Sequence, residues 1–132
     1  MMAIENSLNP WAPKVLSILR IVAALLFVEH GAMKLFSFPA PMGMPLELFS
    51  LIGLAGILEF FGGLILAIGL FSRAIAFVLS GEMAFAYFME HFPKSFFPAL
   101  NMGDGAILFC FIFFYIVFAG PGPWSADAIR KK

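Results

Sequence analysis

Residues 47–70 read ELFSLIGLAGILEFFGGLILAIGL, and they indicate the fold class more directly than any other stretch. Apart from Glu47 and Glu59, this run has no charged residue. A helix needs about 20 mostly apolar residues to cross the roughly 30 Å of bilayer hydrocarbon. A transmembrane β-strand would be shorter and would alternate between apolar and polar residues. The run therefore predicts a membrane-spanning helix with a carboxylate near its middle.

Three further stretches, 14–36, 73–92 and 104–120, have the same apolar character. The 132-residue chain is 62% apolar and 12% charged, whereas a soluble domain is about 45–50% apolar and about 25% charged. A chain this short cannot bury so much apolar surface away from water. We therefore predict an all-α membrane protein, a four-helix transmembrane bundle. It forms a single domain over residues 1–132 and ends in a short tail at 121–132.

The predicted connections contain helix-breaking residues. The first loop holds four of them, Pro39, Pro41, Gly43 and Pro45. Asn9 followed by Pro10 fits the start of the first span, because Asn caps helices well and Pro is tolerated in the first turn. Asn101 fits the cap of the fourth span, and Asp104 would lie in its first turn, where the helix dipole favours an acidic group.

The cations are distributed unevenly between the two predicted membrane faces. Four spans place both termini on one side, which carries six cations: Lys14, Arg20, Arg73, Arg130, Lys131 and Lys132. The other side carries only Lys34 and Lys94. Because cytoplasmic segments are enriched in Lys and Arg, both termini are predicted to be cytoplasmic. A cleaved signal peptide over residues 1–41 is the alternative, but the first span is too long and too charged for one.

Charge balance and cysteine count exclude several classes of protein. Eight Lys and Arg residues balance eight Asp and Glu residues, which argues against a nucleic-acid binder. The single cysteine, Cys110, excludes an internal disulfide, a CxxC redox pair and a cysteine zinc site. The adjacent pairs Glu29-His30 and Glu90-His91 point about 100° apart on a helix, unlike the Glu-x-x-His motif of di-metal bundles. No metal site and no intrinsic cofactor are expected.

Ionisable residues inside the spans mark candidate functional positions, because each is energetically unfavourable in lipid. They predict a polar pocket in the outer half of the bundle, which opens outward and is lined by Glu29, His30, Lys34, Glu59, Glu82, His91 and Asp104. The candidates for catalysis are Glu59, Glu82 and His30. A set of phenylalanines lies close to this region in the sequence and is compatible with a flat apolar ligand or with ordinary packing: Phe85, Phe88, Phe92, Phe96 and Phe97.

Glu59 is the strongest single signal, because Gly56 and Gly63 follow the same helix face and permit close approach of another helix. This face is predicted to point at protein. Glu59 and Glu82 are each compatible with a proton-handling role or with a structural hydrogen bond. Lys34 is expected to pair with a carboxylate or to extend to the membrane surface. Arg20 is expected to extend likewise or to hold a backbone carbonyl.

Several segments, taken in order, resemble the DoxX family. After Arg20 these are HGAMKLF (30–36), EFFGG (59–63), GLFSR (69–73), MAFAY (83–87), NMGD (101–104) and GPGPWSAD (120–127). The resemblance covers residues 14–128. It departs from the family at Asp104, where a glutamate is expected, so the carboxylate is kept on a shorter side chain.

The resemblance implies a multi-pass protein of the cytoplasmic (inner) membrane of a bacterium or archaeon. It also implies a connection to redox chemistry, since the family is similar to a membrane subunit of thiosulfate:quinone oxidoreductase. Other members are connected with thiol-stress or oxidative-stress complexes. It identifies no catalytic residues, so whether the chain is itself an oxidoreductase stays open.

Three functions remain as hypotheses. The first is a quinone-linked redox subunit, in which quinone is an exchangeable ligand and a redox partner protein supplies electrons. The second is a non-enzymatic assembly or scaffold subunit of a membrane redox or stress complex. The third is a small proton-coupled transporter. The glycine-rich face of the second span is also compatible with a homodimer.

Overall fold

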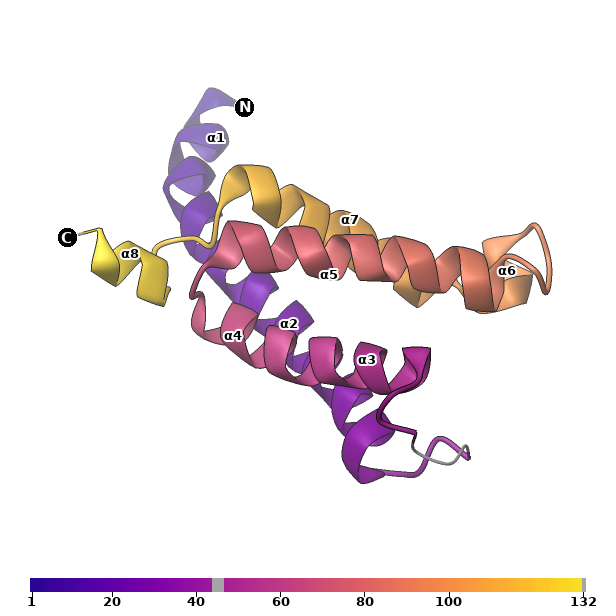
Figure 1. The fold of residues 1–132 in the computed structure, drawn as a ribbon. Helices are drawn as coiled ribbons and strands as arrows, with labels where there is room; N and C mark the ends of the chain where they lie inside the picture. The colour runs from indigo at the N-terminus through magenta and orange to yellow at the C-terminus, as the bar shows by residue number, and fades with distance from the viewer. Residues whose placement is uncertain (44–46, 132) are drawn as a thin grey trace.

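The computed structural model describes residues 1–43 and 47–131, and these residues form helices joined by turns, without a β-strand among them (Figure 1). The all-helical prediction is therefore confirmed for this part of the chain. Two predicted features, Pro45 in the first loop and Lys132 in the tail, lie outside the described residues.

The first helical run is longer than predicted. It consists of α1 (Met2–Leu8), a 3₁₀ turn η1 (Asn9–Trp11) and α2 (Ala12–Phe36). The prediction that a helix starts at Asn9 is wrong, because Pro10 lies in the first turn of η1, where its missing N–H group breaks no helical hydrogen bond. The run ends at Phe36 as predicted, where Ser37 adopts a left-handed conformation with φ of 54°.

The second and third runs each contain a π-helical turn. The second is α3 (Leu51–Ile57), η2 (Leu58–Gly62) and α4 (Gly63–Ile68). The third is α5 (Ser72–Ala86) followed by η3 (Tyr87–His91). A π turn adds one residue to the helix and is often found at functional sites. Both insertions change the direction of the side chains that follow them.

The last part of the chain is α6 (Pro98–Asn101), α7 (Asp104–Ala119) and α8 (Ala126–Arg130). The prediction that Asn101 caps the fourth span is wrong, because Gly103 occupies the cap position of α7. The Asn101 side chain instead accepts a hydrogen bond from the Gly103 N–H at 2.8 Å and closes the turn between α6 and α7. Because its side-chain oxygen is used in this local hydrogen bond, Asn101 does not cap the first turn of α7.

The helices are arranged as two packed pairs. Helix α2 packs along α3, η2 and α4, and α5 packs along α7 (Figure 1). Both termini lie on the left of Figure 1, away from α6 on the right. The two pairs meet in a small core in which Phe27 of α2 contacts Phe113 of α7 edge-on, with ring centroids 5.0 Å apart.

The outer surface of the molecule is strongly apolar. The runs Met2–Phe36 and Leu51–Ile68 are long and apolar enough to cross a membrane, and Asp104–Ala119 is a shorter apolar helix. Large apolar side chains point outward, including Phe77, which is 65% exposed, and Phe111, which is 64% exposed. So much exposed apolar surface favours a lipid environment.

Candidate functional site

An ion pair joins the first and second helical runs. The Lys34 ammonium lies 2.6 Å from Oε2 of Glu59, and the two side chains are 14% and 4% exposed. The prediction that Lys34 pairs with a carboxylate is confirmed, and the partner is Glu59. Because few water molecules can reach this pair, each charge depends on the other for stabilisation.

Glycines bring the two helices close enough for this pair to form. Gly31 of α2 lies against the backbone of η2, where an added Cβ would come within 2.8 Å of the Phe60 Cα. At Gly63, an added Cβ would lie 2.7 Å from the Val28 Cγ2. Lys34 follows Gly31 by about one turn, so it meets Glu59 directly. The predicted protein-facing side of the second span is confirmed, since Glu59 is 3% exposed.

Glu82 of α5 brings a second carboxylate to this pair. Helix α5 packs against η2 and α4 at this level, and the charges of Glu59 and Lys34 both act on Glu82. Both Glu82 carboxylate oxygens are buried, and neither has a hydrogen-bond partner among residues 1–43 and 47–131. A buried polar group without a partner is energetically unfavourable. Glu82 therefore has capacity for an interaction that the described chain does not supply.

His30 lies at the edge of the same group. It precedes Lys34 by about one helical turn on α2, and its ring meets Phe109 of α7 edge-on at 6.2 Å. Phe109 in turn stacks on Phe113 at 5.8 Å and contacts Phe27 at 5.5 Å. His30 is exposed, so it is a polar group at the surface beside this cluster of aromatic rings. We refer to His30, Lys34, Glu59 and Glu82 as the carboxylate site.

The remaining predicted pocket residues lie outside the carboxylate site. Glu29 is exposed on α2, and Asp104 is exposed in the first turn of α7. His91 Nδ1 lies 3.0 Å from the Asn101 carbonyl oxygen, and its ring stacks on Tyr87. Within the described ranges, no hydrogen bond or ion pair joins Glu29, His91 or Asp104 to the carboxylate site.

The phenylalanines that were singled out near the pocket all lie on the exposed surface: Phe85, Phe88, Phe92, Phe96 and Phe97. The last four of them form successive edge-on pairs, as Phe88 and Phe92 do at 5.7 Å. The aromatic rings beside the carboxylate site come instead from the interior faces of α2 and α7. The sequence did not show which rings of α7 face the interior, because α7 is apolar on every side.

Asn101 has a structural role that the sequence reading missed. It is 1% exposed, and its Nδ2 donates to the Ser95 carbonyl at 2.9 Å and to the Tyr87 hydroxyl at 3.2 Å. Together with its bond from Gly103, these contacts tie the loop after η3 to the start of α7. The available signal was a polar residue in a loop between two apolar spans.

Charged side chains at the opposite end of the bundle bind backbone atoms. Arg20 is fully buried and donates to the carbonyl groups of Pro121, Ala67 at 3.3 Å and Trp124 at 2.7 Å. The prediction that Arg20 holds a backbone carbonyl is confirmed. Arg73 donates to the carbonyls that end α7, at residues 117 and 118.

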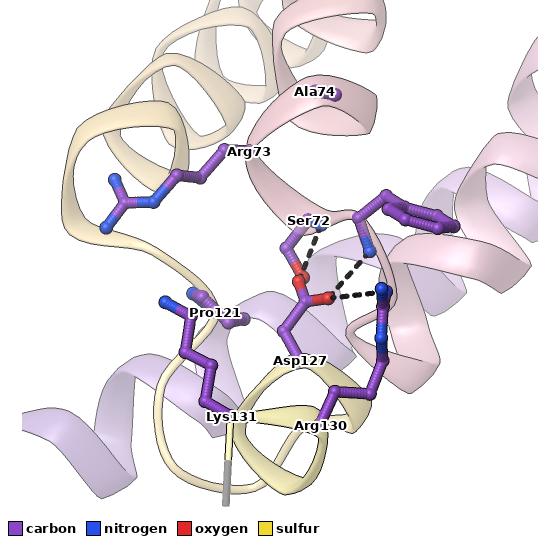
Figure 2. Close-up of a pocket in the computed structure, with 8 residues that line it drawn as sticks. Ser72, Arg73, Ala74, Pro121, Asp127, Arg130 and Lys131 are labelled. Carbon is purple, nitrogen blue, oxygen red and sulfur yellow. Dashed lines mark hydrogen bonds and ion pairs between the residues drawn. The ribbon is translucent and has the colours of Figure 1, made fainter.

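Asp127 completes this end of the molecule. Its carboxylate accepts hydrogen bonds from the N–H groups of Phe71 at 2.9 Å and Ser72 at 2.8 Å, at the start of α5 (Figure 2). Burial acts to raise the pKa of the Asp127 carboxyl. The backbone hydrogen bonds from Ser72 and Phe71 and the charge of Arg130 outweigh burial, so this pKa lies below its usual value. We refer to Arg20, Arg73 and Asp127 as the terminal lock.

Comparisons with known proteins agree with this architecture. The model of the DoxX family matches residues 15–92, from α2 through η3. A protein of Haemophilus influenzae, described as uncharacterized, is 40% identical over 132 aligned positions, which cover 92% of this chain and 95% of the relative. No solved structure matches the chain. The matched segment contains the whole carboxylate site and more than half of the sequence, so the chain belongs to the DoxX family of membrane proteins.

Proposed function

We propose that this chain is a quinone-linked redox subunit whose carboxylate site moves protons inside the membrane. One observation carries the proposal: both oxygens of Glu82 are buried without a hydrogen-bond partner in the described chain, next to the Lys34–Glu59 pair. Ionisable groups held inside a membrane protein commonly mark proton or ligand pathways.

The proposed membrane arrangement has four crossings, formed by α2, by α3 to α4, by α5 with η3, and by α7. The apolar exterior and the length of the first two runs support it. Both termini would lie in the cytoplasm of a bacterium, because the end with the termini carries most of the cations. The packing of α7 on α5 supports treating residues 1–132 as one domain.

The carboxylate site combines proton-donating groups with apolar rings, and a quinone needs both. A bound quinone accepts two electrons and two protons. Glu82 is positioned to hold a proton and donate it to a carbonyl oxygen, and it has no competing partner in the described chain. Lys34 and Glu59 form a charge pair that can relay a proton, and exposed His30 connects the site to the surface. The rings of Phe27 and Phe109 supply an apolar wall.

The electrons come from a partner protein in this proposal. The chain has one cysteine and therefore no dithiol of its own. Its contribution is to seat the quinone and to deliver protons, while a redox partner delivers two electrons. We therefore propose a subunit of an oxidoreductase complex.

A scaffold role is the second candidate, because the Lys34–Glu59 pair is well formed within the chain. A bond of 2.6 Å between two nearly buried groups is what a purely structural pair would show. In this case the pair would specify how α2 and η2 pack and how a partner subunit docks. Glu59→Gln would then reduce the amount of assembled complex, and the complexes that do form would be fully active.

Mass spectrometry of lipids extracted from gently purified protein tests the quinone proposal. We expect near-stoichiometric quinone in the wild type and at least about a tenfold loss in Glu82→Leu, because the hydrogen bond from Glu82 is removed. The matched control is Glu29→Leu, which removes an exposed carboxylate of α2 and should retain quinone. Glu82→Gln keeps a hydrogen-bonding amide and should retain more quinone than Glu82→Leu.

Two outcomes contradict this proposal. Equal amounts of quinone in the wild type and in Glu82→Leu would mean that any bound quinone lies elsewhere. Quinone missing from the wild type, both when isolated and when purified with its partner subunit, would favour the scaffold role.

A further inference from the structure

A cavity of about 400 Å³ lies at the end of the molecule that carries the terminal lock. It is open to the surface and is lined by the start of α5, the loop after α7, and α8 (Figure 2). Two tryptophans at the same end are exposed, Trp11 by 57% and Trp124 by 52%. Exposed tryptophans of membrane proteins lie at the level of the lipid headgroups. In the proposed membrane arrangement, the cavity would open at headgroup level.

The lining of this cavity is cationic. Arg73, Arg130 and Lys131 contribute three positive charges and Asp127 one negative charge, which leaves a net charge of +2 (3 − 1). The Asp127 carboxylate is already engaged by two N–H groups of the α5 start. Its negative charge is therefore directed at the helix and not at the centre of the cavity.

The three cations have different amounts of spare hydrogen-bonding capacity. Arg73 uses Nη1 for the α7 carbonyls, and its other guanidinium nitrogens make no hydrogen bond among residues 1–43 and 47–131. Arg130 lies over the Phe71 ring at 4.7 Å and 3.9 Å from Asp127, and its side chain is 56% exposed. Within the described ranges the Lys131 side chain makes no hydrogen bond or ion pair, and Figure 2 shows it reaching toward Pro121, on the same side as Arg73.

We propose that this cavity binds the phosphate group of an anionic phospholipid. Arg73 and Lys131 lie on the same side of the cavity (Figure 2), and such neighbouring Arg and Lys side chains are the usual partners of a phosphate, with the planar guanidinium offering two parallel donors. Basic pockets between membrane helices at this level recognise anionic headgroups. The apolar surface next to the cavity favours a lipid over a free anion, since Phe71 is 56% exposed and Phe118 is 68% exposed. The acyl chains would lie along these rings.

Native mass spectrometry of the full chain in a neutral detergent tests the proposal, with phosphatidylglycerol and phosphatidylcholine as the added lipids. We expect phosphatidylglycerol to bind at least about tenfold more tightly than phosphatidylcholine. Lys131→Gln should weaken phosphatidylglycerol binding about fivefold, the effect of one lost cation near a headgroup. The matched control is Lys14→Gln, which removes one cation at the same end, where Lys14 lies over the Trp11 ring at 4.4 Å. This control should bind as the wild type does.

Three results would overturn the lipid site. Equal weakening by Lys131→Gln and Lys14→Gln would mean general surface attraction. Equal affinity for the two lipids would mean that charge is not recognised. Competition by glycerol phosphate at the same concentration as the lipid would identify a free-anion site. Since the Lys131 side chain makes no hydrogen bond or ion pair among the described residues, a failure to fold is not expected, and unchanged thermal unfolding would verify this. The result is independent of the quinone proposal, because Lys131 and Lys14 lie at the end of the molecule with the terminal lock and outside the carboxylate site.

Discussion

The terminal lock and the carboxylate site both place charges inside an apolar molecule, and they treat those charges differently. In the lock, Arg20 binds three backbone carbonyls and Asp127 binds two backbone N–H groups. In the carboxylate site, side chains face other side chains, and Glu82 has no hydrogen-bond partner in the described chain. The partners in the lock are backbone groups, which cannot take up or release a proton. The partners in the carboxylate site include carboxylates, which can.

This difference suggests that the lock stabilises the fold and that the carboxylate site serves ligand binding and proton transfer. Charges that bind carbonyls at the ends of α4 and α7 fix how those helices and the tail meet, so removing one should loosen the fold. Charges that bind only each other leave protons free to move between them. We therefore expect substitutions in the lock to affect mainly stability. Substitution of Glu82 should affect mainly ligand binding.

The largest expected effect comes from Arg20→Met, which removes the centre of the lock. Three hydrogen bonds from the fully buried Arg20 guanidinium, each contributing about 1.5–3 kcal/mol, are lost, so a destabilisation of about 5 kcal/mol is expected. Thermal unfolding in a neutral detergent should show a midpoint lower by more than about 10 °C. The midpoint of Arg20→Lys should lie between those of the wild type and Arg20→Met, because one ammonium group cannot reach all three carbonyls. A midpoint within about 2 °C of the wild type for Arg20→Met would mean that the lock does not hold the fold.

The two carboxylates should respond to the same substitution in opposite ways. Glu59→Gln leaves the nearly buried Lys34 without its anion and should destabilise the protein by about 3 kcal/mol. Glu82→Gln removes a buried carboxylate that lacks a partner, so stability should stay the same or rise. Thermal unfolding of both variants is the measurement.

A double variant provides the control for this pair. Lys34→Gln combined with Glu59→Gln should recover part of the stability that Glu59→Gln loses, because no unpaired charge remains. If Glu82→Gln were as damaging as Glu59→Gln, Glu82 would have a structural partner, and the contrast between the two regions would fail.

The smallest expected effect concerns Asp127 and depends on pH. Its pKa is lowered in the folded protein. The stabilisation is therefore fully present above the pKa of the unfolded chain, about 3.9, and is lost as the pH falls through the lower folded value. Asp127→Asn should destabilise the protein by about 1 kcal/mol at pH 7.

Thermal unfolding of Asp127→Asn and the wild type at pH 7 and near pH 3 tests this prediction. The difference between the two proteins should shrink at the lower pH, as the wild-type carboxylate becomes protonated. A difference that is the same at both pH values would mean that the charge of Asp127 does not contribute.

Much of the fold follows from local features of the sequence. Apolar runs of helical length indicate the four helical runs, and the end of α2 at Phe36 agrees with the predicted span. The helix boundaries at Asn9 and Asn101 were mispredicted, because both residues have alternatives to capping. Asn9 continues a helix through a 3₁₀ turn, and Asn101 closes a loop with its side chain.

The sequence predicted which residues form the carboxylate site, and it did not predict which of them pair with one another. The sequence by itself determined that Lys34, Glu59 and Glu82 lie in apolar spans and that Lys34 needs an anion. Only the tertiary structure decided that Glu59 is that anion and that Glu82 has no hydrogen-bond partner in the described chain. The physical reason is that pairing depends on helix rotation. One added residue, as in η2, turns every later side chain by about 100°.

The terminal lock shows the same division. The apolar runs predicted helices, and the tail rich in glycine and proline predicted that the last long helix stops near residue 120. That Arg20 binds the carbonyl of Pro121, 101 residues later, was decided by the path of the tail. Gly120 and Gly122 both have positive φ angles there, which direct the carbonyls between them toward α2. Hydropathy and helix propensity are local properties, whereas the direction of a carbonyl in a distant turn is set only when the helices have packed.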